Sequence, residues 1–162
     1  MIFVTVGHQM PFDRMIRLVD QWAGTNPQQT IFAQIGESSY QPQHMEYARL
    51  LSRGDFDSYL QRCDSVIAHA GTGTIIQVLG QDKPLLVFPR LSKLAETRND
   101  HQVGTARHFA NKGQLLAAFD EQEFLQRLDE LPQFRPAQAM GKHASPQLLE
   151  RLKNFVKSSD SA

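Results

Sequence analysis

The turn HAGTGT, residues 69–74, lies between an apolar segment and a helix-like segment. Its glycines permit unusual backbone angles and leave no side chain in the path of a ligand. The N–H groups and the partial positive charge at a helix N-terminus suit a phosphate. The pattern therefore predicts a phosphate site formed by His69, Gly71, Thr72, Gly73 and Thr74. The alternative is tight strand–helix packing, with Thr72 as the helix cap and His69 as a partly buried brace.

Residues from two other segments could meet the same ligand. Gln77 lies one helical turn beyond Gly73 and could hydrogen-bond a ribose, although a surface glutamine with no such role is the simpler interpretation. Gly7 and His8 follow the first apolar segment, where the Gly7 backbone could contact the ligand. His8 is a possible general base, and a loop histidine without chemistry is its alternative.

A polar run, RNDHQ at residues 98–102, opens another predicted helix. Amide side chains at this position can bracket sugar hydroxyls. The alternative is a capping box, in which Asn99 is the N-cap and Gln102 follows three residues later. Both interpretations can hold, because Asp100 and His101 would still face outward.

Several classes of site do not fit the sequence. The glycine turn has Ile76 where a dinucleotide fingerprint needs a third glycine, and no Gly-Lys-Ser/Thr follows as in a P-loop. A nucleotide-sugar diphosphate stays open because it needs N–H groups but neither signature. The lone cysteine, Cys63, excludes an internal disulfide and a four-cysteine zinc site. His44, His108 and His143 have no metal-like spacing with each other, so the sequence indicates no metal and no cofactor. A formal net charge of zero does not indicate nucleic-acid binding.

The chain alternates between strand-like and helix-like segments, as judged from short apolar runs and from helical spacing of apolar residues. Strands are expected at residues 2–6, 30–35, 45–51, 65–68, 85–88 and 115–117. Helices are expected at residues 11–22, 56–63, 74–79, 99–112 and 121–131. Pro11 is expected in a first helical turn and Asp55 as a helix cap. The alternation predicts an α/β fold, a single Rossmann-like domain with a mostly parallel, doubly wound sheet, whose ligands bind beyond the C-terminal ends of the strands.

The predicted domain boundary follows the last of these helices. Residues 1–131 form the expected Rossmann-like domain, and residues 132–162 the expected connector and amphipathic C-terminal helix, at 147–156. The sequence shows neither a signal peptide nor the ~20 apolar residues of a membrane span. A cytoplasmic location is therefore expected, and any membrane contact would come through a surface or a partner.

Four segments, in order, resemble glycosyltransferase family 28, C-terminal half. They are IFVTVGHQMPFDRMI, VIAHAGTGT, KPLLVFPR and RNDHQVGTARHFANKG. The chain is most similar to the small PssE-type subunits of bacterial exopolysaccharide synthesis. These are similar to the catalytic subunit of the eukaryotic dolichol-pathway UDP-GlcNAc transferase and to the C-terminal half of MurG. The resemblance implies that residues 1–131 are the donor-binding, C-terminal half of a GT-B fold.

The resemblance also assigns the candidate residues to parts of a UDP-sugar. The 69–74 turn would lie at the donor diphosphate, and Gly7 and His8 would face the crevice between the two halves. Gln77 matches a ribose-binding position that is often glutamate, so here a charge-assisted bond is lost. The segment 99–102 matches the part that reads the hexose, with Gln102 foremost.

The resemblance implies one subunit of a two-subunit, metal-independent, inverting transferase. Such an enzyme would move a hexose from a UDP-sugar to a lipid-linked acceptor in exopolysaccharide or capsule synthesis. The catalytic base usually belongs to the other half, for which 162 residues leave no room. A PssD-like, membrane-anchored, acceptor-binding partner is therefore expected. The apolar stripe Leu148–Val156 could dock on that partner or pack on its own domain.

Two other functions stay open. The chain could be a non-catalytic helper subunit that stabilises a partner glycosyltransferase. It could also be a stand-alone nucleotide-sugar enzyme such as an epimerase, against which its length argues. The donor could be UDP-glucose, UDP-galactose, UDP-glucuronate or UDP-GlcNAc, and a cation at Arg90 or Arg98 near the hexose would favour glucuronate.

Overall fold

A computed structural model describes residues 1–137 of the chain. At its centre is a six-stranded, all-parallel sheet with the strand order β3-β2-β1-β4-β5-β6. The strands are β1 (Ile2–Thr5), β2 (Ile31–Gln34), β3 (Glu46–Ala48), β4 (Ser65–His69), β5 (Leu85–Phe88) and β6 (Leu116–Ala117). This order and the crossover helices are those of a Rossmann-like, doubly wound fold, as the sequence predicts.

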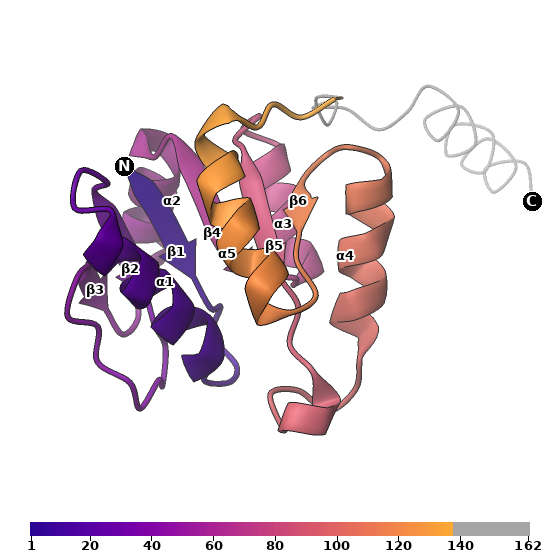
Figure 1. The fold of residues 1–162 in the computed structure, drawn as a ribbon, viewed down its shortest axis with the longest axis horizontal. Coiled ribbons are helices and arrows are strands. Elements are labelled where there is room, and N and C mark those ends of the chain that lie inside the picture. The colour runs from indigo at the N-terminus through magenta and orange to yellow at the C-terminus, as the bar shows by residue number, and fades with distance from the viewer. Residues whose placement is uncertain (138–162) are drawn as a thin grey trace, which may run out of the picture.

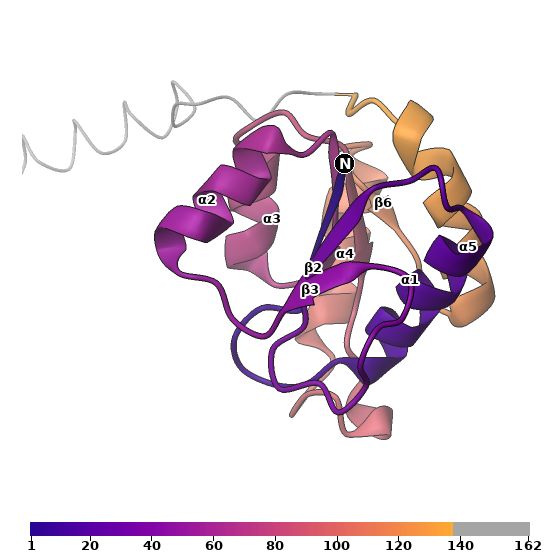
Figure 2. The ribbon, with the colours of Figure 1, turned by 90° about the vertical axis from the view of Figure 1, so that its left-hand side faces the viewer.

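The helices cover both faces of the sheet (Figures 1 and 2). Helices α1 (Asp13–Thr25) and α5 (Glu121–Glu130) pack on one face. Helices α2 (Arg53–Arg62), α3 (Thr72–Leu79) and α4 (His101–Asn111) pack on the other. Two short 3-10 helices, η1 (Ser92–Leu94) and η2 (Leu131–Gln133), lie in the connections.

The central strands are apolar because both of their faces are buried. In β1, Ile2 and Val4 belong to the core cluster beneath α1 and α5, whereas Phe3 points into the cluster beneath α2 and α3. Every residue of β1 and β5 is buried. The sheet is therefore a rigid platform, and the loops beyond its carboxyl edge are free to carry polar groups.

The structure corrects three local predictions from the sequence. Helix α1 begins at Asp13 with Phe12 as its N-cap, so Pro11 lies outside the first turn. Ser52, not Asp55, caps α2: Ser52 Oγ accepts a hydrogen bond from the Asp55 N–H (3.1 Å) and donates one to Asp55 Oδ2 (2.7 Å). Asp55 is thus the N3 residue, which the Ser52 side chain caps, and not the cap itself. The edge strand β3 is shorter than the predicted strand, at Glu46–Ala48.

The C-terminal predictions lie outside the described residues. They comprise the helix at 147–156, its Leu148–Val156 stripe and most of the connector. The division of the chain at residue 131 stays a prediction.

An aromatic stack joins β5 to both helices on one face of the sheet. The ring centroid of Phe88 lies 5.8 Å from that of Phe12 and 4.5 Å from that of Phe124. Phe124 is fully buried. We expect Phe124→Ala to lower the free energy of unfolding by about 3–5 kcal/mol, because it removes this packing and leaves a cavity. Urea denaturation measures the change.

Leu125→Ala is the matched control, because the neighbouring Leu125 is 37% exposed. Its cost should stay below about 1 kcal/mol. Equal losses in the two variants would contradict the packing of α5 described above.

Candidate functional site

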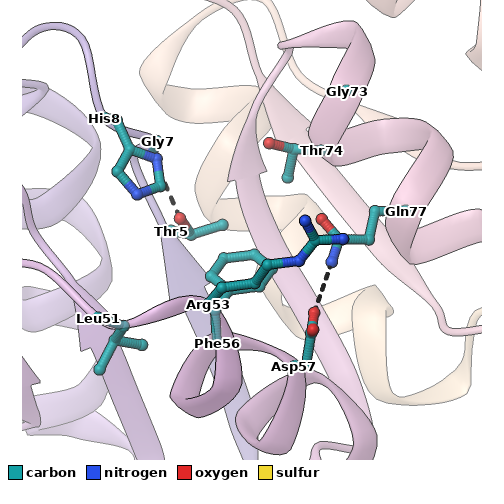
Figure 3. A pocket seen from close by; sticks show the side chains of 10 residues that line it. All are labelled: Thr5, Gly7, His8, Leu51, Arg53, Phe56, Asp57, Gly73, Thr74 and Gln77. Carbon is teal, nitrogen blue, oxygen red and sulfur yellow. Dashed lines mark hydrogen bonds between the residues drawn. The ribbon is translucent and has the colours of Figure 1, made fainter.

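The carboxyl ends of β1 and β4 form the point where the strand order reverses. The chain runs from β1 outward to β3 on one side and from β4 outward to β6 on the other. Open α/β sheets bind ligands at such a switch point. A cleft of about 610 Å³ lies there, between the β1–α1 loop, the start of α2 and the start of α3 (Figure 3). Its lining residues are Thr5, Gly7, His8, Leu51, Arg53, Phe56, Asp57, Gly73, Thr74 and Gln77.

The N-terminus of α3 opens into this cleft. Gly71 is the N-cap and no side chain caps the helix, so Thr72 is not the cap that the packing alternative requires. The N–H groups of the first helical turn have no partner within the helix. Gly73 lines the cleft, and a Cβ added there would meet no atom within 4 Å. Packing therefore does not require glycine at 73, whereas an anion that approaches these N–H groups would benefit from it.

The His69 ring lies between the loop that contains Gly7 and the loop that contains Gly71. A Cβ added at Gly7 would lie 2.7 Å from His69 Cε1, and one added at Gly71 would clash with His69 Nε2. Gly7 also has φ +77°, a conformation that L side chains rarely adopt. Packing around the ring thus explains glycine at 7 and 71, which agrees with the interpretation of His69 as a brace.

The environment of His69 keeps its ring uncharged. Burial lowers the pKa of His69 to about 4, and the positive charge of Arg90 acts in the same direction. Its ordinary pKa is about 6.5. At neutral pH the imidazole is therefore a neutral packing element beneath the cleft.

Two buried polar side chains hold the β1–α1 loop by its carbonyl groups. Arg90 donates from one terminal nitrogen to Val6 O (2.8 Å) and to Met10 O. Gln34 Nε2 donates to Gly7 O (3.3 Å). Gln34 was not predicted from the sequence, and Arg90 was considered as a hexose contact. The sequence signal that could have identified Gln34 is a polar residue at the end of an otherwise apolar strand.

The orientation of Arg90 does not support that hexose contact. Its side chain is 3% exposed and turns inward to the loop carbonyls. Burial lowers the pKa of Arg90, and the charge of Glu96 opposes that shift. Arg98 is exposed in the β5–α4 connection.

An ion pair fastens the β5–α4 connection to α1. Arg14 donates from Nε to Glu96 Oε1 (2.7 Å) and from a terminal nitrogen to Glu96 Oε2 (2.8 Å). Glu96 Oε2 also accepts from the Leu91 N–H (2.9 Å). Both side chains are largely buried, at 14% and 11% exposure. This bidentate geometry fixes the β5–α4 connection against α1.

The segment 99–102 does not form the capping box that was the alternative to a sugar contact. Helix α4 begins at His101 with Asp100 as its N-cap, and no side-chain cap bond forms. Gln102 is buried, and its Oε1 accepts from the Arg90 N–H (3.2 Å). Asn99 Oδ1 instead accepts from the His101 N–H (3.2 Å), and both residues are exposed, like Asp100. The capping box does not form because the Gln102 side chain accepts a hydrogen bond from the Arg90 N–H in the β5–α4 connection, and not from a backbone N–H at the start of the helix.

The structure thus gathers some of the predicted residues and separates others. Five line the cleft: Gly7, His8, Gly73, Thr74 and Gln77. His69, Gly71 and Thr72 do not line it, although the His69 ring lies next to Gly7, which does. The four residues 99–102 do not line it.

The cleft also contains side chains from α2 that sequence reasoning missed. Asp57 Oδ1 accepts a hydrogen bond from Gln77 Nε2 at 2.8 Å (Figure 3). Arg53 and Phe56 belong to the same wall. No local motif marks them, because they reach the cleft only through the packing of α2 beside α3.

His8 is exposed and lies on the β1 side of the cleft, opposite α3 (Figure 3). This position is compatible with proton transfer at the mouth of the site, provided that an acceptor approaches from outside. Within residues 1–137, no group of three or more His, Cys, Asp or Glu side chains is arranged to hold a metal ion. In the same part of the chain, no helix has the length and apolar character needed to cross a membrane.

Substitution by alanine should change the free energy of unfolding differently at Gly71 and at Gly73. Gly71→Ala should cost about 1–3 kcal/mol of unfolding free energy, because the added methyl group meets the His69 ring. Gly73→Ala should leave stability unchanged or raise it by up to about 1 kcal/mol, as in an exposed helix position. Chemical denaturation of both variants tests this. A large loss at 73 would show that packing, not ligand access, requires that glycine.

The low pKa of His69 predicts a stability change with pH. The buried neutral His69 ring contributes fully to the free energy of unfolding above pH 6.5, where the ring is also neutral in the unfolded chain. This contribution is lost as the pH falls from about 6.5 towards 4, because protonation then favours the unfolded chain. Between pH 7 and pH 4.5 the protein should lose about 2–3 kcal/mol more than a His69→Phe variant, whose ring does not titrate. Denaturation curves at both pH values measure the difference. Parallel losses would contradict a neutral buried ring.

Comparison with known proteins places the chain in a family. The model of the "Glycosyltransferase family 28 C-terminal domain" matches residues 1–159. A UDP-N-acetylglucosamine–N-acetylmuramyl-(pentapeptide) pyrophosphoryl-undecaprenol N-acetylglucosamine transferase of Prochlorococcus marinus (strain MIT 9312) is 31% identical over 83 residues. The match covers 49% of this chain and 22% of that protein, so this chain spans only a small part of the curated relative.

Solved structures show the same fold. The solution NMR structure of ALG13 has a TM-score of 0.63 and 20% identity, and the match covers 93% of both chains. The crystal structure of Acinetobacter baumannii MurG has a TM-score of 0.63 and 17% identity, over 96% of this chain and 49% of that one. The sheet described above is thus that of a GT-B C-terminal half, and, since the family model matches residues 1–159, the chain belongs to the glycosyltransferase family 28 C-terminal domain family.

Proposed function

We propose that this chain is the donor-binding, catalytic subunit of a two-subunit inverting glycosyltransferase. It would move a hexose from a UDP-sugar to a lipid-linked acceptor in exopolysaccharide or capsule synthesis. In this role it would act as a PssE-type subunit. The observation that carries the proposal is the cleft at the switch point, where the uncapped start of α3 faces the Gly7–His8 loop.

The chemistry of this cleft suits a nucleotide diphosphate. The α3 N–H groups and helix dipole would bind the diphosphate beside Gly73 and Thr74. The volume of about 610 Å³ lies within the range of ligand pockets, about 300–1,000 Å³. Phe56 and Leu51 add apolar surface on the α2 side, which suits a base.

The same groups would assist the transfer step. An acceptor hydroxyl would attack the anomeric carbon as the bond from that carbon to the diphosphate oxygen breaks. Preorganised N–H groups would stabilise the charge that develops on the departing diphosphate. His8, at the mouth of the cleft, is the candidate in this chain for the base that takes the hydroxyl proton.

The acceptor would come from a second protein. A PssD-like, membrane-anchored subunit, expected from the resemblance, would close the open side of the cleft and present the lipid-linked acceptor. The similarity to ALG13 over 93% of both chains supports a donor half carried on a separate chain. The predicted stripe Leu148–Val156 is a candidate contact for this partner.

A thermal-shift panel tests donor binding directly. A UDP-sugar at about 100 times its Kd should stabilise the protein by about 2.7 kcal/mol, which raises Tm by about 5–10 °C. Gly73→Asp should abolish this shift, because its carboxylate would occupy the anion position. Gly104→Asp is the matched control, since a Cβ at this exposed glycine of α4 also meets no atom within 4 Å. It should retain the shift.

Transfer by the assembled pair distinguishes a catalytic subunit from a helper. Activity should appear only with both subunits and should be lost with Gly73→Asp. Full activity of the pair containing Gly73→Asp would identify a non-catalytic helper instead. The absence of a shift with UDP-glucose, UDP-galactose, UDP-glucuronate and UDP-GlcNAc would contradict the proposed donor site.

A further inference from the structure

A carboxylate from α2 faces the start of α3 across the cleft. Asp57 is the one carboxylate among the lining residues within the described part of the chain. Its Oδ1 accepts from Gln77 Nε2 at 2.8 Å, which ties α2 to α3 (Figure 3). The two residues are 20 positions apart in the sequence, so tertiary packing creates this pair.

The Asp57–Gln77 pair is suited to accept hydrogen bonds from hydroxyl groups. The amide nitrogen of Gln77 is engaged by Asp57, which leaves the amide oxygen of Gln77 and Oδ2 of Asp57 as neighbouring acceptors. An ionised carboxylate only accepts hydrogen bonds, and its bonds are stronger than those of a neutral acceptor. Two adjacent acceptors match the two donors of a vicinal diol.

The position of the pair fits a ribose that follows a phosphate. Gln77 lies four residues after Gly73 on α3, about 6 Å along the helix axis at 1.5 Å per residue. A ribose joins its phosphate through one oxygen and one methylene group, so a phosphate at the helix start would bring the sugar to this wall. Phe56, the residue before Asp57, supplies apolar surface beyond it.

We propose that Asp57, oriented by Gln77, accepts a hydrogen bond from the ribose 2′-hydroxyl and makes the site select ribonucleoside over 2′-deoxyribonucleoside diphosphates. This inference rests on the proposed donor site and adds a specificity-determining residue to it. Arg53, on the same wall, keeps a positive charge at the edge of the cleft beside the carboxylate.

Titration calorimetry with UDP and 2′-deoxy-UDP tests the assignment. The wild-type chain should bind UDP about tenfold more tightly than 2′-deoxy-UDP, the difference expected for one hydrogen bond to a charged group. Asp57→Asn and Asp57→Ala should weaken UDP binding by about the same factor and leave 2′-deoxy-UDP affinity unchanged. The unchanged deoxynucleotide affinity also shows that the variants are folded.

A rescue variant separates a carboxylate requirement from a local structural effect. Asp57→Ala combined with Gln77→Glu moves the carboxylate to α3 and should restore most of the preference for UDP. Asp82→Asn is the matched control. Asp82 is exposed in the turn after α3, and its φ of +54° is one that asparagine tolerates. The Asp82→Asn variant should bind both nucleotides as the wild type does.

Each outcome has a distinct meaning. Equal wild-type affinity for the two nucleotides, or equal loss of both in the Asp57 variants, would overturn the role of Asp57 and leave the donor site standing. A wild-type chain that binds neither nucleotide would overturn the proposed function, and this inference with it.

Discussion

The contact of the His69 imidazole with the backbones of Gly7 and Gly71 sets the geometry of the whole carboxyl edge. The ring separates the loop after β1 from the loop after β4, and side chains at either glycine would collide with it. These loops form opposite walls of the cleft at the switch point. Because burial keeps the ring neutral, it fills this space without adding a positive charge between the two loops.

A layer of buried polar groups maintains this arrangement. Arg90 and Gln34 bind carbonyl oxygens of the β1–α1 loop, and Gln102 binds the backbone of Arg90. Buried polar side chains are costly unless they are hydrogen-bonded. The bonds to the loop carbonyls offset part of that cost, whereas Gln34 Oε1 and Arg90 Nε have no partner within residues 1–137. The shape of the cleft therefore depends on buried residues that are not part of its lining.

The fold itself was predictable because its signals are local. Uninterrupted apolar runs at β1, β4 and β5 indicate strands buried on both faces, and the intervening helical spacing indicates crossover helices. The errors were also local in origin. Pro11 and Asp55 each fit a helix start, yet neighbouring residues compete for such positions, and here Phe12 and Ser52 are the N-caps. Gln102 fits a capping pattern but has a buried partner, Arg90, that no sequence window contains.

The sequence by itself determined the order of the elements, the family resemblance and the glycine turn as a phosphate candidate. It also showed that position 77 lacks a carboxylate. Only the tertiary structure brought Asp57 from α2 against Gln77, turned Arg90 away from the cleft and separated residues 99–102 from its lining. The physical reason is that helical and strand periodicities depend on adjacent residues, whereas side-chain partners across a cleft depend on how distant elements pack on a common sheet.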